Sequence, residues 1–216
     1  MQLPVNILLD VAVLSNVTTF DWRWSDKGSG AQMNGGFWHP ISPDSRHFKP
    51  LGSVAVSGYQ DINGQVPVIL VGDNPSSRPE GKDWPAVASP MHYELVWDDK
   101  GSGAENDGSI WRPVAPHGYV CVGDVVANGY HRPSHDAIWC LRNDLVFDGS
   151  YDSPVIWSNA GSGVQRDTSI WGVNDQPRHP RIKVPAPDNY HPTFRCSKTH
   201  AEPDLHLAKY LGFYQA

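Results

Sequence analysis

The chain has 216 residues, a formal net charge of -6 at pH 7 and 17 basic residues spread thinly along its length. Binding to a nucleic-acid backbone needs clustered basic side chains, so we expect no nucleic-acid partner. The 20 glycines, 19 prolines and charged fraction of 19% favour short strands joined by turns over helices. This length fits one self-sufficient domain, which would span residues 1–216.

A regular alternation marks the N-terminus, where apolar side chains occupy every second position: Val5, Ile7, Leu9, Val11 and Val13. This period of two predicts one long strand over residues 3–14 with a buried face. No basic residue precedes Arg23 and Asp10 interrupts the apolar run, so we interpret it as mature structure rather than a signal peptide. No apolar run approaches the length of a transmembrane helix. We therefore expect a soluble protein, in the cytoplasm or released by a non-classical route.

One motif occurs three times, at residues 24–38, 97–111 and 157–171. Its pattern is Trp, any residue, Asp or Asn, any residue, Gly-Ser-Gly, Ala or Val, two of any residue, Asn or Asp, two of any residue, a large apolar residue and Trp. Such agreement in three places indicates internal repeats that set the architecture. Each copy predicts a strand that ends in Trp, a glycine turn, and a return strand that carries the second Trp.

The match between the first two copies continues beyond the motif. Residues 51–59 (Leu-Gly-Ser-Val-Ala-Val-Ser-Gly-Tyr) correspond to residues 122–130 (Val-Gly-Asp-Val-Val-Ala-Asn-Gly-Tyr). Later strand-sized pieces follow at residues 66–71 in the first copy and 137–141 in the second, with residues 193–196 as the third.

The C-terminal part departs from this regularity. The segment from Pro177 to Pro192 holds five prolines, which predict a long loop or a ragged edge. Beyond it lie the apolar residues Leu205, Leu207, Leu211 and Phe213. They predict a last strand that pairs with the N-terminal strand and completes the sheet of the third repeat. A short amphipathic helix over residues 205–211 is the alternative.

Three repeats of this kind need a shared core, because each sheet has one apolar face to hide. We place the repeats at about residues 18–92, 93–152 and 153–216, the last completed by the strand over residues 3–14. The predicted fold is all-β, a β-prism with pseudo-three-fold symmetry. A β-trefoil is the alternative, but successive motifs start 73 and 60 residues apart, which exceeds what a trefoil unit needs.

Three runs of the second repeat resemble the vacuolar protein sorting-associated protein 62 family. They are Asp-Lys-Gly-Ser-Gly-Ala, Ser-Ile-Trp-Arg-Pro-Val-Ala-Pro-His-Gly-Tyr and Val-Gly-Asp-Val-Val-Ala-Asn-Gly-Tyr, and the resemblance is clearest over residues 93–145. The resemblance implies a β-rich fold without known enzymatic chemistry. Prism-type domains are often lectins or receptor-binding parts of insecticidal toxins, so analogy at the level of the fold suggests a defence or insecticidal role.

The Gly-Ser-Gly loops are the candidate ligand sites. Glycine lets backbone N–H groups approach a ligand, an Asp can accept hydrogen bonds from hydroxyl groups, and a neighbouring Trp can offer a stacking face. The candidate binding residues are Asp26, Gly28, Ser29, Gly30, Trp38, Asp99, Gly101, Ser102, Gly103, Trp111, Asn159, Gly161, Ser162 and Gly163. The alternative is that the loops are turns and nothing more. For the first Trp of each copy, Trp24, Trp97 and Trp157, strand alternation favours the core.

Signatures of catalysis are absent from the motif. Met33 stands where a dinucleotide fingerprint would have its third glycine, and neither a Gly-x-Ser-x-Gly elbow nor a Walker lysine occurs. We therefore expect no enzyme and no cofactor. His131 and His135 form the best local metal candidate, but Pro133 disrupts their spacing, and we expect no metal site.

The three cysteines, Cys121, Cys140 and Cys196, are an odd number, so at least one thiol stays free. We expect all three to be buried and reduced.

Two functions fit these observations. The first is recognition of glycans or a membrane receptor through the repeated loops, for which three similar sites on one body would gain strength on a multivalent surface. The second is a structural or trafficking scaffold whose repeats serve only the fold, with function in the surfaces of residues 60–90 or 175–204. A homo-oligomer or a partner chain is compatible with both.

Overall fold

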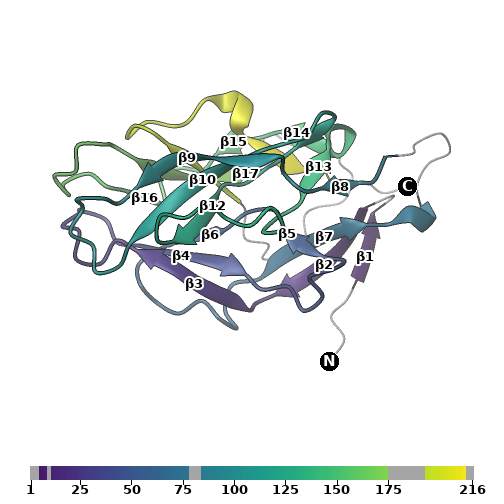
Figure 1. Ribbon diagram of the computed structural model, residues 1–216, viewed down its shortest axis with the longest axis horizontal. Coiled ribbons are helices and arrows are strands. Elements are labelled where there is room, and N and C mark those ends of the chain that lie inside the picture. The colour runs from purple at the N-terminus through teal and green to yellow at the C-terminus, as the bar shows by residue number, and fades with distance from the viewer. Residues whose placement is uncertain (1–4, 9–10, 78–83, 175–192, 213–216) are drawn as a thin grey trace.

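A computed structural model describes residues 5–8, 11–77, 84–174 and 193–212 of the chain (Figure 1). The described residues form strands, short 3-10 turns and no α-helix, so the all-β prediction is confirmed. A helix long and apolar enough to cross a membrane does not occur among them.

Three sheets share one plan, and each contains one copy of the motif. In every one, the strand before the glycine turn pairs with the return strand, which pairs in turn with a third strand. The first sheet has the order β3 (Phe20–Ser25), β4 (Gly35–Pro40), β6 (Val54–Ser57). The second has the order β9 (His92–Asp98), β10 (Gly108–Val114), β12 (Val125–Asn128). The third has the order β16 (Trp157–Ser158), β17 (Ser169–Asn174), β18 (Phe194–Ser197), and β15 (Ser150–Tyr151) also pairs with β17.

The remaining described strands form three further sheets, of four, three and two strands, toward the end of the molecule away from the glycine turns (Figure 1). One sheet has the order β1 (Val5–Leu8), β2 (Val11–Val17), β7 (Val68–Asp73), β5 (Lys49–Pro50). The others are β11 (Tyr119–Val120), β13 (Cys140–Arg142), β8 (Val87–Ala88), and the pair β14 (Val146–Asp148) with β19 (Lys209–Leu211). The 3-10 turns are η1 (Pro75–Ser77), η2 (Asn143–Leu145) and η3 (Leu205–Leu207). No sheet built by the described residues closes into a barrel, so the β-trefoil alternative is wrong.

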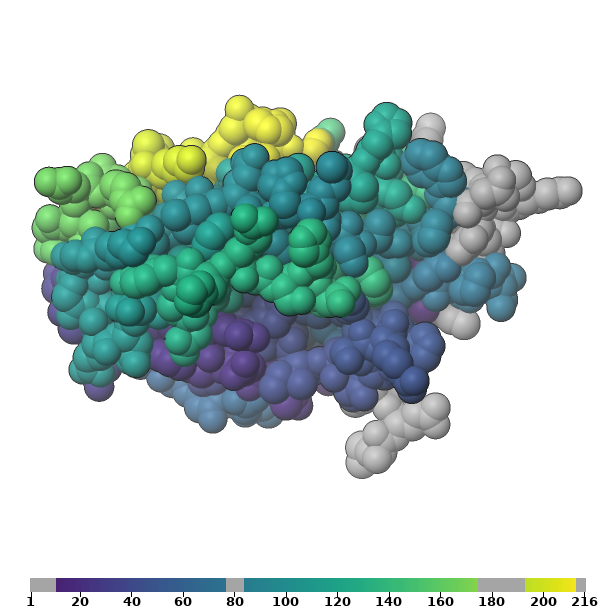
Figure 2. Space-filling view, viewed as in Figure 1, coloured from purple at the N-terminus to yellow at the C-terminus, as the bar shows by residue number. Residues whose placement is uncertain are grey.

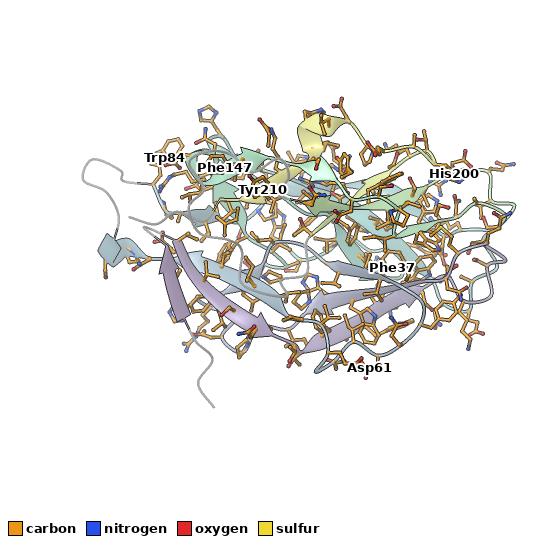
Figure 3. The ribbon with its side chains drawn as sticks, turned by 180° about the vertical axis from the view of Figure 1, so that it is seen from behind. Phe37, Asp61, Trp84, Phe147, His200 and Tyr210 are labelled. Carbon is orange, nitrogen blue, oxygen red and sulfur yellow. A yellow bond between two sulfur atoms is a disulfide. The ribbon has the colours of Figure 1, made fainter. Side chains whose placement is uncertain are left out.

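The core between the three equivalent sheets is made of equivalent residues. On each sheet a tryptophan lies opposite a Phe or Ile, which lies opposite a third apolar residue: Trp24, Phe37 and Ala55; Trp97, Ile110 and Val126; Trp157, Ile170 and Cys196. All of them belong to one buried cluster. The three tryptophans are 1 to 2% exposed, so their predicted place in the core is confirmed. Figure 3 shows Phe37 between the layers, and a second, aliphatic cluster joins β2, β7 and β13.

Residues 3–14 are not one strand. β1 and β2 pair antiparallel, with Val5 opposite Leu14 and Leu8 opposite Val11. A period of two does not reveal a reversal of the chain, because both strands of a hairpin alternate in the same way. β2 then pairs with β7 of the first repeat, so the predicted completion of the third repeat by the N-terminal strand is wrong.

The tail also differs from its prediction. The 3-10 turn η3 takes the place of the alternative helix, and β19 pairs with β14 rather than with the N-terminal strand. Residues 193–196 fall mainly in β18, which pairs with β17 as β6 pairs with β4 and β12 with β10. The counterparts of β18 are therefore β6 and β12, and not the pieces at residues 66–71 and 137–141. The predicted loop from Pro177 to Pro192 lies outside the described residues.

Cys121 and Cys140 form a disulfide, with their Cα atoms 4.1 Å apart, whereas Cys196 is free and buried. The expectation of three reduced thiols is therefore wrong for two of them. The antiparallel pairing of β11 with β13 places Val120 opposite Leu141. Cys121, which follows Val120, therefore lies opposite Cys140, which precedes Leu141. This pairing joins distant segments, and sequence spacing gives no sign of it.

Candidate functional site

The three glycine turns have the same backbone geometry. In each, the backbone oxygen of the motif's Asp or Asn accepts a hydrogen bond from the serine N–H, at 2.8 to 3.1 Å. Both glycines of every turn take a positive φ, from 75° to 90°, which explains why glycine stands there. These exposed glycines are Gly28, Gly30, Gly101, Gly103, Gly161 and Gly163.

The side chain of the motif's Asp or Asn points into its own turn. Its Oδ1 accepts the N–H of the residue nine positions further on, at 2.7 Å for Asp26, 3.1 Å for Asp99 and 2.9 Å for Asn159. These residues are 2 to 4% exposed, and burial raises the pKa of the Asp99 carboxyl. The side chains therefore fasten the turn and are withdrawn from the surface.

The serines of the motif are also engaged in the turn. The Oγ atoms of Ser29, Ser102 and Ser162 accept the N–H two residues further on, at 3.1 to 3.4 Å. Ser29 and Ser102 are buried, and Ser162 is half-buried. Of the predicted loop residues, the glycine backbone is thus the part that a ligand can reach.

The three turns lie together at one end of the molecule, called here the loop end (residues 26–34, 99–107 and 159–168; Figure 2). Backbone hydrogen bonds of 2.8 Å join them, from Glu105 N–H to Lys27 O and from Gln32 N–H to Ala160 O. The core tryptophans also link the turns by hydrogen bonds. Trp24 Nε1 donates to Asn106 O of the second turn at 2.8 Å, and Trp97 Nε1 donates to Arg166 O of the third turn at 3.1 Å. The ring centroids of the three tryptophans are 5.5 to 5.8 Å apart.

The second tryptophans do not present a stacking face to the turns. Trp38 is 7% exposed and packs in an apolar cluster with Leu14 and Leu70. Trp111 is half-buried, and its Nε1 donates to Ser109 Oγ at 2.8 Å.

A ring from outside the motif lies beside each turn. Tyr59 donates its hydroxyl to Asn34 Oδ1 at 3.1 Å, and Tyr130 donates to Asp107 Oδ1 at 3.0 Å. The strand register places His200 at the same position of the third repeat.

His200 lies at the loop end (Figure 3), with Nε2 2.9 Å from Asn159 Oδ1 and 3.7 Å from Asp167 Oδ1. The Gly-Tyr pairs at the ends of residues 51–59 and 122–130 were a signal for the first two rings. His200 gave none, because its equivalence follows from strand pairing alone.

Tyr59 and His200 are exposed and Tyr130 is half-buried, and each ring has a polar partner. Tyr59 is 42% exposed, and partial burial together with nearby Asp26 raises the pKa of Tyr59 to about 12. Lys100 Nζ lies 4.5 Å from the ring centroid of Tyr130 and covers part of that ring. Each repeat thus places an aromatic or imidazole ring beside an amide or carboxylate oxygen of its turn.

The histidine segment singled out for metal has other contacts. His135 Nδ1 is 3.2 Å from Pro90 O, and Asp136 forms an ion pair with Lys49. Within the described ranges, no three His, Cys, Asp or Glu side chains gather in a way that could hold a metal ion.

Comparison with known proteins supports the fold. The solved structure of GNIP1Aa from Chromobacterium piscinae is similar, with a TM-score of 0.68 at 22% sequence identity. The likeness covers 91% of this chain and 35% of that chain, so this chain corresponds to a minor part of that protein's length. The curated proteins give no match.

The family comparison covers most of the sequence. Residues 6–207 match the family described as Vacuolar protein sorting-associated protein 62, which includes all three copies of the motif. The chain therefore belongs to the vacuolar protein sorting-associated protein 62 family, as its second repeat predicted.

Proposed function

We propose that the protein is a non-enzymatic recognition protein that binds glycans of a cell surface through the loop end. The observation that carries this proposal is the ring beside each turn: Tyr59, Tyr130 and His200 stand at equivalent positions, each next to an amide or carboxylate oxygen. A sugar offers C–H faces that stack on rings and hydroxyl groups that donate to such oxygens. The glycines of the three turns are exposed at the same end of the molecule.

The architecture that we propose for this function is a β-prism with pseudo-three-fold symmetry. The equivalent rows of core residues and the contacts between successive turns support it. A rigid body of this kind would hold three weak sites at fixed spacing, and this suits the receptor-binding part of a defence or insecticidal toxin.

A glycan array tests the proposal. We expect the wild type to bind a subset of glycans, and the combined variant Tyr59→Ala, Tyr130→Ala, His200→Ala to lose at least about tenfold in signal, since stacking contacts contribute about 1 kcal/mol each. Trp84→Ala is the matched control, because Trp84 is 50% exposed and lies at the opposite end from His200 (Figure 3). Absence of glycan binding by the wild type, or equal loss in the control, would contradict the proposal.

The second candidate is a scaffold, favoured by the use of the motif's Asp, Asn, Ser and first Trp in the fold. If the protein is a scaffold, the substitutions of Tyr59, Tyr130 and His200 by Ala would change neither the signal on the glycan array nor the melting temperature. Variants of Asp26 or Asp99 do not separate the two functions, because both carboxylates hold their turns.

A further inference from the structure

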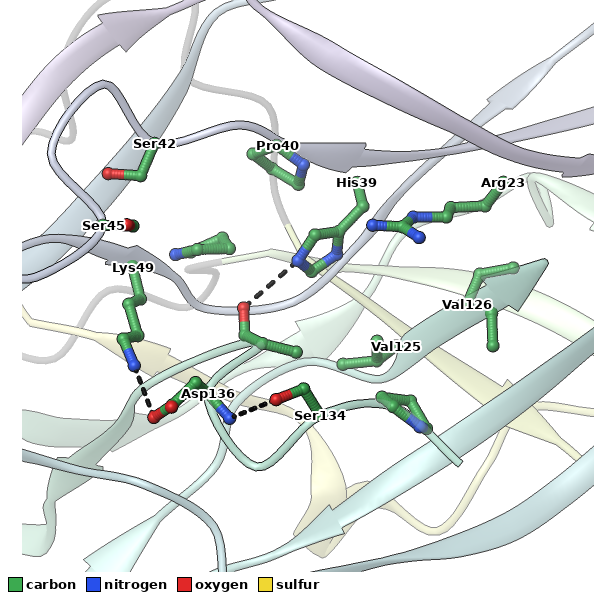
Figure 4. A pocket seen from close by; sticks show the side chains of 14 residues that line it. Arg23, His39, Pro40, Ser42, Ser45, Lys49, Val125, Val126, Ser134 and Asp136 are labelled. Carbon is green, nitrogen blue, oxygen red and sulfur yellow. Dashed lines mark hydrogen bonds and ion pairs between the residues drawn. The ribbon is translucent and has the colours of Figure 1, made fainter. Parts of the chain in front are cut away.

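A pocket of about 340 Å³ opens between the first two sheets (Figure 4), and none of its lining residues belongs to the loop end. One wall comes from β4 and the segment that leads to β5, and the other from β12 and the turn before β13. The volume suits a small molecule.

Arg23 reaches this pocket because β3 carries a bulge. Trp22 lies opposite Trp38 and Trp24 opposite Phe37, so Arg23 is an extra residue without a cross-strand partner. A bulge redirects the side chain of the extra residue. The second sheet has the same bulge at Val96, which packs in the apolar core. An arginine therefore stands where the neighbouring repeat has an apolar residue.

The guanidinium of Arg23 retains unused hydrogen-bonding capacity. Its Nη2 is 3.2 Å from the exposed Asp21 Oδ2. Its Nε is buried and has no hydrogen-bond partner among the described residues. The Arg23 side chain is 31% exposed, so a ligand in the pocket reaches the guanidinium through its terminal nitrogens rather than through Nε. A hydrogen bond to a charged group there stabilises the bound ligand.

His39, on the same wall, is held neutral. Ser53 Oγ accepts the Val126 N–H at 3.0 Å, so its own proton is free to donate to His39 Nδ1, 3.0 Å away. His39 Nε2 then donates to Ala137 O at 3.1 Å. Both ring nitrogens are occupied, so the pocket's charge comes from other residues.

The corresponding place between the second and third sheets is filled by the protein itself. The strand register makes Arg112 and Asp124 the counterparts of His39 and Ser53. Asp124 bonds there to Arg112 and Arg195 and has no exposed surface. Between the first two sheets the equivalent pair is His39 and Ser53, and Ser53 Oγ accepts the Val126 N–H as Asp124 Oδ2 accepts the Cys196 N–H. This pair brings no arginine and no carboxylate to the pocket, which His39 lines.

The lining of the pocket is cationic although the chain is acidic overall. Among the lining residues, Arg23 and Lys49 contribute two positive charges and Asp136 one negative charge, which leaves one positive charge on the lining in a protein of net charge -6; the exposed Asp21 that pairs with Arg23 lies outside this lining. The hydroxyls of Ser42 and Ser134 each accept a backbone N–H at 3.2 Å, so their protons are free to donate to a ligand. Cations with convergent donors favour an anion.

We propose that this pocket binds a small soluble acid that carries hydroxyl groups, a sugar carboxylate or a sugar phosphate, whose acidic group pairs with Arg23. The site is separate from the loop end and does not depend on glycan binding there.

Isothermal titration calorimetry with glucuronate, glucose 6-phosphate and glucose tests this site on the full chain. We expect at least one acid to bind at least about tenfold more tightly than glucose, because a hydrogen-bonded charge pair contributes that much. The acid that binds identifies the group that the pocket prefers. Arg23→Gln should weaken binding at least about tenfold, and Lys198→Gln, which lies outside the lining, should not.

A second variant tests the same site independently, in case Arg23→Gln does not fold. Ser45 is exposed at the pocket, so Ser45→Glu adds a competing carboxylate without disturbing the core, and it should also weaken binding at least about tenfold. Equal affinity for glucose and both acids would overturn the proposal. So would acid binding that survives in both Arg23→Gln and Ser45→Glu.

Discussion

The carboxylate of Asp124 has no exposed surface, and it accepts hydrogen bonds from two arginines and a backbone N–H. Arg112 Nη2 and Arg195 Nη1 lie 2.8 Å from its oxygens, and Cys196 N–H lies 2.9 Å away. Burial alone would raise the pKa of Asp124, but the two guanidinium groups and these hydrogen bonds hold it below its usual range. The charged form is thus fixed between the second and third repeats.

Asp124→Asn leaves both arginines without their counter-charge in the interior. We expect the free energy of unfolding to fall by about 3–5 kcal/mol, the usual cost of breaking a buried ion pair from one side. Urea denaturation measures the change. Asp61→Asn is the matched control, because Asp61 is exposed and serves a local turn, and it should stay within about 0.5 kcal/mol of the wild type. Equal stability of the two variants would contradict the role of Asp124.

His39 makes the stability of the folded protein depend on pH. Burial, with the charge of Arg23, lowers its pKa from 6.5 to about 4. Between these values the unfolded chain binds a proton that the folded protein excludes, so stability falls as the pH is lowered from 6.5 to 4. The full difference corresponds to about 3 kcal/mol.

His39→Gln removes this titration and keeps a polar side chain. The difference in unfolding free energy between wild type and variant should therefore shift by up to about 3 kcal/mol between pH 7 and pH 4, in favour of the variant at low pH. Urea titrations at several pH values measure it. A difference that stays constant across this range would show that His39 titrates normally in the folded state.

At the scale of elements, the glycine turns and the hairpins that they close were predictable, and the pairings between strands distant in the sequence were not. Asp26, Gly28 and Gly30 lie within one turn, so their roles follow from local geometry. The pairing of β19 with β14 joins residues about sixty positions apart, which no local pattern records. His200 was missed for the same reason, since its place beside the third turn depends on the register of β18.

The contact of β4 with β16 shows how tightly the repeats pack. A Cβ atom on Gly35 would lie 2.7 Å from Trp157 Cγ, so Gly35→Ala must displace a core tryptophan. We expect a loss of about 1–3 kcal/mol, with a change in near-ultraviolet circular dichroism. Gly101→Ala is the comparison: its Cβ would meet open space, and its positive φ should cost stability without changing the tryptophan signal. An unchanged tryptophan signal in Gly35→Ala would contradict this packing.

At the scale of the whole molecule, three turns from distant parts of the chain form one surface. The motif predicted that the turns are equivalent, but it did not predict which groups they expose. The Asp and Asn side chains face inward because the chain must satisfy buried N–H groups, such as that of Gly108. The outward positions are left to Tyr59, Tyr130 and His200, which lie outside the motif.

If the loop end carries three glycan sites, binding must depend on the spacing of the ligand. Once one site is occupied, the second and third bind at a high effective concentration, so avidity gains of about 10²–10⁴ are expected on a dense surface. Surface plasmon resonance at graded glycan densities measures this gain. Tyr130→Ala should reduce the gain more than the affinity at low density, because one site of three is lost from each multivalent contact. An apparent Kd that does not change with density would mean that the three turns act as one site or as none.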